Sequence, residues 1–198
     1  SGTFDAPNIY NTISTMASYA ARLDYNYNSI YYLTINFRAD GSSKFLNHWG
    51  YFPGAALAWN MGNQDFFKNA LPFISNSKLR VSYGVNGNNR VGDFASYPTL
   101  RLNNTGGGYS FNNAPPTPGA YLTSLGNAGL KWERTKQIDI GYELGVLDDR
   151  IALEVDLYHR LTEDLLLSTE LPRSSGFSSA QKNVGKLLNR GIEISLNT

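Results

Sequence analysis

A two-residue alternation of apolar and polar side chains recurs along this chain in segments of about ten residues. In the segment 19–27, for example, Arg22 and Asp24 stand between apolar residues on either side. Successive side chains of a β-strand point to opposite faces, so this period predicts strands with one apolar and one polar face. Seven strands are predicted, at residues 19–27, 31–40, 51–60, 79–86, 136–146, 151–158 and 191–196. We therefore expect an all-β chain, with helix only in short pieces such as 65–69.

The links between these strands alternate between short and long. Very short links follow the first and fifth strands, which read as the first arms of hairpins. Long links cover residues 41–50, 87–134 and 161–186, and only the link 61–78 breaks the alternation. Outer-membrane β-barrels have short periplasmic turns and long extracellular loops, and tilted strands of about ten residues cross the membrane. The spacing therefore favours antiparallel up-and-down strands of a transmembrane β-barrel.

Charged residues fall on the polar phase of the predicted strands. A cation at the centre of a lipid-facing surface would cost about 2 to 4 kcal/mol, so this segregation favours a barrel whose polar phase faces an aqueous lumen. The lumen-facing candidates are Arg22, Asp24, Arg38, Asp40, Arg80, Asp139, Glu143, Glu154 and Asp156. A soluble β-sandwich shows the same alternation. The alternative is therefore a soluble carbohydrate-binding or adhesion domain.

Aromatic residues gather near the ends of the apolar phase. Outer-membrane barrels carry girdles of aromatic side chains at both membrane interfaces. The expected interfacial anchors are Tyr19, Tyr27, Tyr31, Tyr51, Trp59 and Trp132. Trp132 has a second interpretation, as a platform on which a sugar ring stacks, and the anchor is favoured because any barrel is expected to carry tryptophan at the interface.

Composition excludes several classes of function. The net charge is +1, with 17 basic and 16 acidic residues, so no strong field is available to bind nucleic acid. The chain has no cysteine, which excludes disulfides, thiolate metal sites and thiol nucleophiles. His48 and His159 show no metal-ligand spacing, and no cofactor is expected. No apolar run reaches the 20 or so residues of a membrane-spanning helix, and any export signal is expected to lie outside this sequence.

Two patterns suggest catalysis or phosphate binding only superficially. The carboxylate pairs Asp139/Glu143 and Glu154/Asp156 resemble the paired acids of glycosidases. On the polar face of a strand, however, such acids are better interpreted as lumen charges that pair with arginine or lysine on neighbouring strands. The segment 38–43 lacks the glycine spacing of a phosphate loop, and its charged residues are expected to pair with each other. We expect no enzymatic activity.

The longest link, residues 87–134, carries four aromatic residues that are candidates for contact with a ligand or a protein lid. Loops of this length without regular structure are usually functional or disordered. The four are Tyr97, Tyr109, Phe111 and Tyr121.

Short motifs follow one another along the whole chain in the order of a known family. They are RADGSSKF (38–45), YFP (51–53), LRVSYG (79–84), LKWE (130–133), DLL (164–166), NVG (183–185) and NRGIE (189–193). Each is weak alone, but as an ordered set they resemble the SusC/RagA-type TonB-dependent transporters of the Bacteroidetes outer membrane. Departures are small: Gly54 follows Pro53 where the family tends to have serine, and Ala128 stands where proline is common.

The resemblance implies that residues 1–198 belong to the C-terminal part of a barrel of about 22 strands in the bacterial outer membrane, which seven strands cannot close. The rest of that barrel, an N-terminal plug and the segment that contacts TonB would lie outside this sequence. In the family, an oligosaccharide or peptide is held between the barrel protein and a SusD-like surface lipoprotein, and energy arrives through TonB. The expected partners are therefore that lipoprotein, TonB, outer-membrane lipid and a glycan or peptide substrate.

Overall fold

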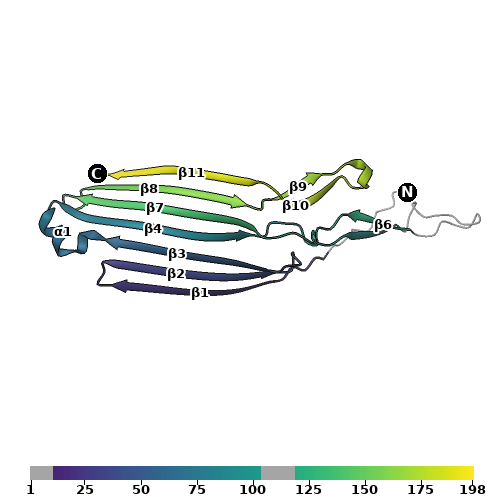
Figure 1. Cartoon of the computed structure of the whole chain (residues 1–198), viewed down its shortest axis with the longest axis horizontal. Coiled ribbons are helices and arrows are strands. Elements are labelled where there is room, and N and C mark those ends of the chain that lie inside the picture. The colour runs from purple at the N-terminus through teal and green to yellow at the C-terminus, as the bar shows by residue number, and fades with distance from the viewer. Residues whose placement is uncertain (1–10, 104–118) are drawn as a thin grey trace, which may run out of the picture.

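The computed structural model describes residues 11–103 and 119–198, and its main element is one sheet of seven antiparallel strands (Figure 1). The strand order is β1-β2-β3-β4-β7-β8-β11. The bounds of these strands are Met16–Tyr27 (β1), Tyr31–Ser42 (β2), Trp49–Asn60 (β3), Ile74–Asn88 (β4), Glu133–Val146 (β7), Ile151–Glu163 (β8) and Lys186–Asn197 (β11). All seven predicted strands are present, and each is longer than the alternation alone predicts.

The two ends of the sheet differ. The short turns 28–30 and 147–150 lie at one end, together with the helices η1 (Met61–Asn63) and α1 (Asp65–Ala70) (Figure 1). The link after the third strand, which breaks the short–long alternation in the sequence, therefore lies at the turn end and contains the predicted short helix. No helix in the described part of the chain is long and apolar enough to cross a membrane.

Positive backbone φ angles tighten both short turns. Asn28 and Ser29 have φ of 52° and 55°, and Asp148 and Asp149 have 56° and 60°. Asparagine and aspartate adopt this left-handed region more readily than most residues, and consecutive positive φ values match the twist of a hairpin. The local sequence thus fixes the pairing of β1 with β2 and of β7 with β8.

Four further strands lie at the opposite end, which we call the loop end. They form two hairpins, one of β5 (Thr99–Asn103) with β6 (Gly119–Ser124) and one of β9 (Leu166–Glu170) with β10 (Ser179–Asn183), which carries the helix η2 (Arg173–Ser175) between its strands. Figure 1 shows both hairpins projecting beyond the seven-stranded sheet. The alternation does not predict these strands, because they are only five or six residues long.

Strand register separates the side chains of the sheet into two faces. One row of paired positions crosses all seven strands and consists of Tyr25, Leu33, Leu57, Val81, Ile140, Leu157 and Ile192. Leu57 is 59% exposed and Ile192 is 65% exposed. No second sheet covers this row within the described residues. The apolar face is therefore open over its whole width.

The buried core lies at the loop end, where β3 and β4 stop pairing. The β3–β4 ladder reaches only Gly54 and Gly84, whereas β2 continues to pair with β3 as far as Trp49, and β4 continues to pair with β7 as far as Asn88. A hydrophobic cluster packs beside this break, and its members are Phe45, Phe52, Val85, Val91, Leu130 and Trp132. The core therefore joins the loops to the end of the sheet.

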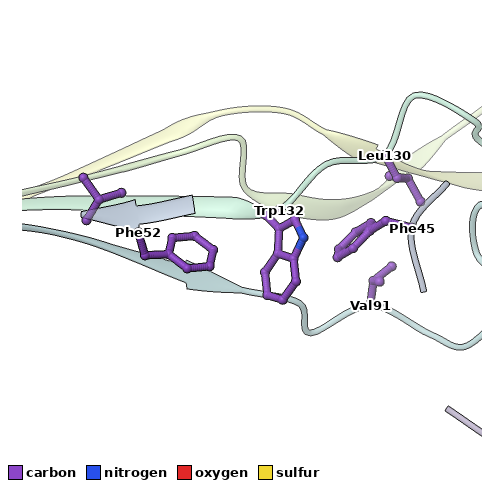
Figure 2. Packing of buried hydrophobic residues seen from close by; sticks show 6 residues of the cluster. Phe45, Phe52, Val91, Leu130 and Trp132 are labelled. Carbon is purple, nitrogen blue, oxygen red and sulfur yellow. The ribbon is translucent and has the colours of Figure 1, made fainter. Parts of the chain in front are cut away.

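The ring of Trp132 is central to this loop-end cluster, between Phe45 and Phe52 (Figure 2). Its centroid lies 5.4 Å from that of Phe45 and 5.5 Å from that of Phe52. Its indole N–H donates to the backbone oxygen of His48 at 3.1 Å. Both the apolar ring and the polar N–H of Trp132 are thus satisfied inside the chain.

Candidate functional site

All nine charged residues that the sequence predicts to face the lumen lie on one side of the sheet, which is its polar face. Paired positions share a face in an antiparallel ladder, and the ladders place nine side chains on the same side of the sheet. These are Arg22, Asp24, Arg38, Asp40, Arg80, Asp139, Glu143, Glu154 and Asp156. The apolar row described above lies on the other side.

Arg80 on β4 is the centre of the densest group of charges. Its Nη2 lies 2.6 Å from Oε1 of Glu154 and 3.2 Å from Oδ1 of Asp156, both on β8. Its Nε lies 3.2 Å from Oε1 of Glu143 on β7. All four side chains are between 26% and 45% exposed. One guanidinium therefore joins three carboxylates from two strands.

Gly141 allows Arg80 to reach β8. In the register, Arg80 pairs with Gly141, and Gly141 pairs with Asp156, so glycine occupies the strand between them. A Cβ at Gly141 would lie 2.3 Å from Oδ1 of Asp156 and 3.0 Å from Nη2 of Arg80. The missing side chain leaves the space through which the ion pair forms.

A chain of hydrogen bonds continues from this group along the same face. Ser82 donates to Oδ2 of Asp139 at 3.1 Å, and Gln137 donates to its Oδ1 at 2.7 Å. Arg160 in turn donates to the side-chain oxygen of Gln137 at 2.8 Å. Asp139 is therefore held by donors from β4 and β7. The predicted pairing with a basic residue of a neighbouring strand is confirmed for Glu143, whereas Glu154 and Asp156 pair with Arg80 across the intervening strand β7. For Asp139 the prediction is wrong, because Ser82 and Gln137 take the place of a basic partner.

On β1 and β2 the charges pair along the strand instead. Arg22 and Asp24 are 2.8 Å apart, and Thr34 donates to Asp24 at 2.6 Å. Arg38 and Asp40 are also 2.8 Å apart, as expected, and Asp40 is buried. Acids and bases are thus matched pair by pair here, whereas carboxylates are in excess around Arg80.

The polar face is hollowed. A hollow of about 900 Å³ is lined by Ser82, Asp139, Glu154, Asp156 and Arg160, among other residues. A second, of about 580 Å³, is lined by residues that include Arg22, Arg38, Asp40 and Trp132. The polar side of the sheet can therefore hold water, a polar ligand or another polypeptide. Among the described residues, no group of three or more histidine, aspartate or glutamate side chains is placed to hold a metal ion.

Aromatic residues on the apolar face form two bands, one at each end of the sheet. At the turn end, Tyr31 stacks with Trp59 at 6.3 Å, next to Tyr27 in the register. At the loop end, Tyr19 stacks with Trp49 at 5.8 Å. The eight steps from Tyr19 to Tyr27 along β1 span roughly 27 Å, at about 3.4 Å per residue. Tyr51, also at the loop end, stacks with Phe37 at 6.2 Å.

Trp132 does not belong to either band. It is 6% exposed and packs in the loop-end cluster. Trp132 is therefore a buried core residue, and the predictions of an interfacial anchor or a sugar-stacking platform are wrong for it. Its place just before β7 in the sequence gave no sign that Phe45 and Phe52 would enclose it. The two-residue alternation predicts the other aromatic positions because they lie within regular strands, whereas Trp132 precedes β7.

Of the four loop aromatics, Tyr97 and Tyr121 are described by the structure. They are 41% and 50% exposed, Tyr97 just before β5 and Tyr121 within β6. Tyr109 and Phe111 lie outside the described residues. Nearby, Asn183 of β10 donates to the backbone oxygens of Lys131 and Asp164 and accepts from the Lys131 N–H at 2.8 Å. This asparagine, which sequence reasoning missed, joins the base of the long loop to the β9–β10 hairpin.

Comparison with known proteins identifies what kind of sheet this is. A family model described as "TonB dependent receptor-like, beta-barrel" matches residues 1–198. The chain belongs to the TonB-dependent receptor β-barrel family. Members of this family are outer-membrane proteins, and the membership, together with the uncovered apolar face, excludes the alternative of a soluble β-sandwich.

The relatives of this chain include proteins named as TonB-dependent receptors, one of which is SusC. The chain is 39% identical over 187 residues to a TonB-dependent receptor of Formosa agariphila, covering 93% of this chain and 17% of that protein. It is 37% identical over 195 residues to the TonB-dependent receptor SusC of Bacteroides thetaiotaomicron, covering 95% and 19%. A chain of the RagAB peptide importer in its open-open state superposes with a TM-score of 0.80 at 29% identity, covering 92% and 19%. The chain therefore spans less than a fifth of the length of these relatives.

Proposed function

We propose that residues 1–198 are part of the barrel wall of a TonB-dependent importer that takes up an oligosaccharide or peptide nutrient together with a SusD-like surface lipoprotein. A plug and a TonB-contacting segment would be supplied by sequence outside this chain. The support is the similarity to SusC and to the RagAB peptide importer. The family is a transporter family, and no catalytic step is needed to explain the polar face.

The apolar face contacts lipid and the polar face lines the aqueous lumen. The observation that carries this assignment is the apolar row that crosses all seven strands without cover, while the hollows and the charged network lie on the other face. Exposed apolar patches of this extent are rare on soluble monomers. The nine charged residues of the polar face would then contact lumen water, the plug or passing substrate.

The two aromatic bands mark the edges of the lipid-facing surface. Amphipathic rings settle at the boundary between hydrocarbon and water. The proposed anchors are Tyr19, Tyr27, Tyr31, Tyr51 and Trp59. The loop end is then extracellular, and the exposed Tyr97 and Tyr121 are placed to contact ligand or the lipoprotein lid.

Site-directed spin labelling of the full-length transporter tests the orientation. The chain has no native cysteine, so single cysteines at Ile192, Ile194 and Asn189 introduce unique sites within this segment, all on β11. Nitroxides at 192 and 194 should collide mainly with oxygen dissolved in the bilayer. A nitroxide at 189, on the other face, should collide mainly with a water-soluble nickel chelate. The reverse pattern would reject the assignment.

Uptake measurements test the transport function. A strain lacking the full-length transporter, complemented with the wild type or with the double variant Tyr97→Ala/Tyr121→Ala, is supplied with fluorescent oligosaccharides or peptides. Complementation by the wild type should restore uptake of one class, and the double variant should reduce it while leaving the amount of folded barrel unchanged. Unchanged uptake of both classes after deletion would contradict the proposal.

A further inference from the structure

The segregation of charges onto the polar face fails at the loop ends of β7, β8 and β11. The apolar phase of these strands includes Ile138, Leu157 and Ile192, and the same phase continues toward the loops into charged residues. On β7 these are Lys136 and Arg134, on β8 His159 and Glu163, and on β11 Arg190 and Lys186. Thr135 and Thr162, which alternate with them, hydrogen bond on the opposite face at 2.9 Å.

Glu163 organises the lysines of this group. Lys136 Nζ contacts its Oε2, and Lys186 Nζ lies 2.9 Å from its Oε1. Each ammonium has three donors and cannot accept, so a single carboxylate contact leaves further donors on both lysines. The Lys186 side chain is 69% exposed and that of Lys136 is 42% exposed. Both lysines thus keep donors that a ligand in solvent or lipid can reach.

The charge of this surface is predominantly positive. Arg134, Lys136, Lys186 and Arg190, here called the exterior basic patch, face one carboxylate of the same phase, Glu163, and Asp164 lies just beyond it. Arg134 and Arg190 are exposed. Within the described residues, neither arginine has an ion-pair partner. The patch therefore presents guanidinium groups suited to a bidentate anionic oxygen ligand.

A small hollow connects the patch to the aromatic band at the loop end. It has a volume of about 200 Å³, and its lining includes Trp49 and Tyr51 from β3 together with Lys131, Arg134 and Asp164. It lies where the β3–β4 ladder has ended. Cationic groups and aromatic faces thus border one notch at the outer edge of the apolar surface.

We propose that the exterior basic patch binds the phosphate groups of an outer-leaflet lipid, whose acyl chains lie against the apolar face below. This rests on the proposed orientation of the two faces. Like-charged side chains gathered at the end of an apolar surface complement a phosphorylated headgroup at the membrane boundary. The lumen, by contrast, receives the matched pairs and the carboxylate excess.

Native mass spectrometry of the full-length transporter in detergent tests this binding. The probes are bisphosphorylated lipid A and the same lipid after removal of both phosphates. The test variant is Lys136→Gln/Lys186→Gln/Arg190→Gln. The matched control is Lys68→Gln/Arg150→Gln/Arg173→Gln, which removes the same charge from exposed residues of the turn end and of the helix η2.

The wild type and the control should bind the phosphorylated lipid, and the test variant should bind it on the order of a hundredfold more weakly, since each basic residue near an anionic surface contributes about fivefold. The dephosphorylated lipid should bind weakly to all three proteins. Because the triple substitution leaves Glu163 unpaired, Glu163→Gln serves as a second variant. It should keep or strengthen binding of the phosphorylated lipid.

Equal binding of the phosphorylated lipid to the wild type and the triple variant would overturn the proposal. So would equal binding of both lipids to the wild type, which would indicate contact with acyl chains alone. A change of oligomeric state in the triple variant with unchanged lipid binding would assign the patch to an interface between copies. The spin labels at Ile192 and Asn189 report the orientation independently, so failure of the lipid site is distinguishable from failure of the proposed function.

Discussion

Arg80 on β4 and Glu154 on β8 form an ion pair, Nη2 to Oε1 at 2.6 Å, although β7 runs between their strands. The side chain of Arg80 crosses β7 above Gly141 and also contacts Glu143 and Asp156. Three strands are thus joined on the polar face by one cation, in addition to their backbone ladders. The stability of this part of the wall should therefore depend on Arg80.

Replacing Arg80 with glutamine should destabilise the folded barrel. Each half-exposed pair contributes up to about 1 kcal/mol. The variant also leaves Glu154 and Asp156 without Arg80, and leaves Glu143 with only Lys78 at 4.0 Å. The measurement is urea unfolding of the full-length transporter in liposomes, at low and high salt. The loss should shrink at high salt, because salt screens the remaining repulsion. Arg150→Gln, at an exposed turn position, is the control, and an equal loss in both variants would contradict the role of Arg80.

Replacing Gly141 with alanine should break the same contact without removing any charge. The new Cβ would overlap Oδ1 of Asp156, so the carboxylate must move away from Arg80. Gly84→Ala is the matched control, because a Cβ there meets no heavy atom within 4 Å. We expect Gly141→Ala to lower the urea midpoint and Gly84→Ala to leave it nearly unchanged. If Gly141→Ala has no effect in a background that already carries Arg80→Gln, the loss is assigned to the ion pair.

A cation on the apolar face should cost more than a cation on the polar face. Ile140→Arg places a charge in the middle of the apolar row and should destabilise the barrel by about 2 to 4 kcal/mol if that row meets hydrocarbon. Ser195→Arg on the polar face lies opposite Glu154 and should be tolerated. The folded fraction after extraction from outer membranes, read from heat-modifiable gel mobility, compares the two. Equal losses would argue against a lipid-facing row.

Truncating Trp132 should loosen the loop end of the sheet. Removal of a buried tryptophan side chain usually costs about 3 to 5 kcal/mol, and here it also removes the donor to the His48 carbonyl. We expect Trp132→Ala to speed hydrogen exchange in residues 43–49 and 89–98. Trp49→Ala is the control, because Trp49 is 41% exposed and lies outside the cluster. Unchanged exchange in Trp132→Ala would show that the cluster does not hold these segments.

Changing Asn183 to aspartate should release the β9–β10 hairpin from the long loop. The substitution removes the amide donor and places a carboxylate against the Lys131 and Asp164 carbonyl oxygens. We expect faster proteolysis within residues 164–185, with the seven-stranded sheet intact. Asn197→Asp, exposed at the end of β11, supplies the comparison. Equal cleavage of both variants would contradict the role of Asn183 in joining the hairpin to the long loop.

The two-residue period predicts the sheet because each face of a strand meets one environment. It places all seven strands and both hairpin turns, and it brings Arg80 and Glu154 to one face, although it does not identify Arg80 as the basic partner of Glu154. That pairing depends on register across β7, which is fixed by long-range ladders rather than by local sequence. The strands end later than the alternation does, because backbone pairing continues in β8 past His159 to Glu163.

The loop end could not be predicted from the same pattern. Phe45, Leu130 and Trp132 lie outside the regular strands, and their burial results from three links meeting beside the break between β3 and β4. Asn183 and Lys131 are 52 positions apart and have no periodic relationship. Three charges of the exterior basic patch were missed because the predicted strands 136–146 and 191–196 begin after Arg134, Lys186 and Arg190, whereas β7 and β11 begin at Glu133 and Lys186.

The hydrophobic cluster beneath the loops limits how a barrel of this kind can acquire a new substrate specificity. Phe45, Val91 and Leu130 come from different parts of the chain but pack against one another, so a transplanted loop would arrive without the partners that shape its base. Recombination between homologous importers would then succeed when its crossover points lie inside the strands and the 43–49, 89–132 and 164–185 segments are inherited together. Substrate range would then diversify by joint exchange of these three segments rather than by exchange of one loop.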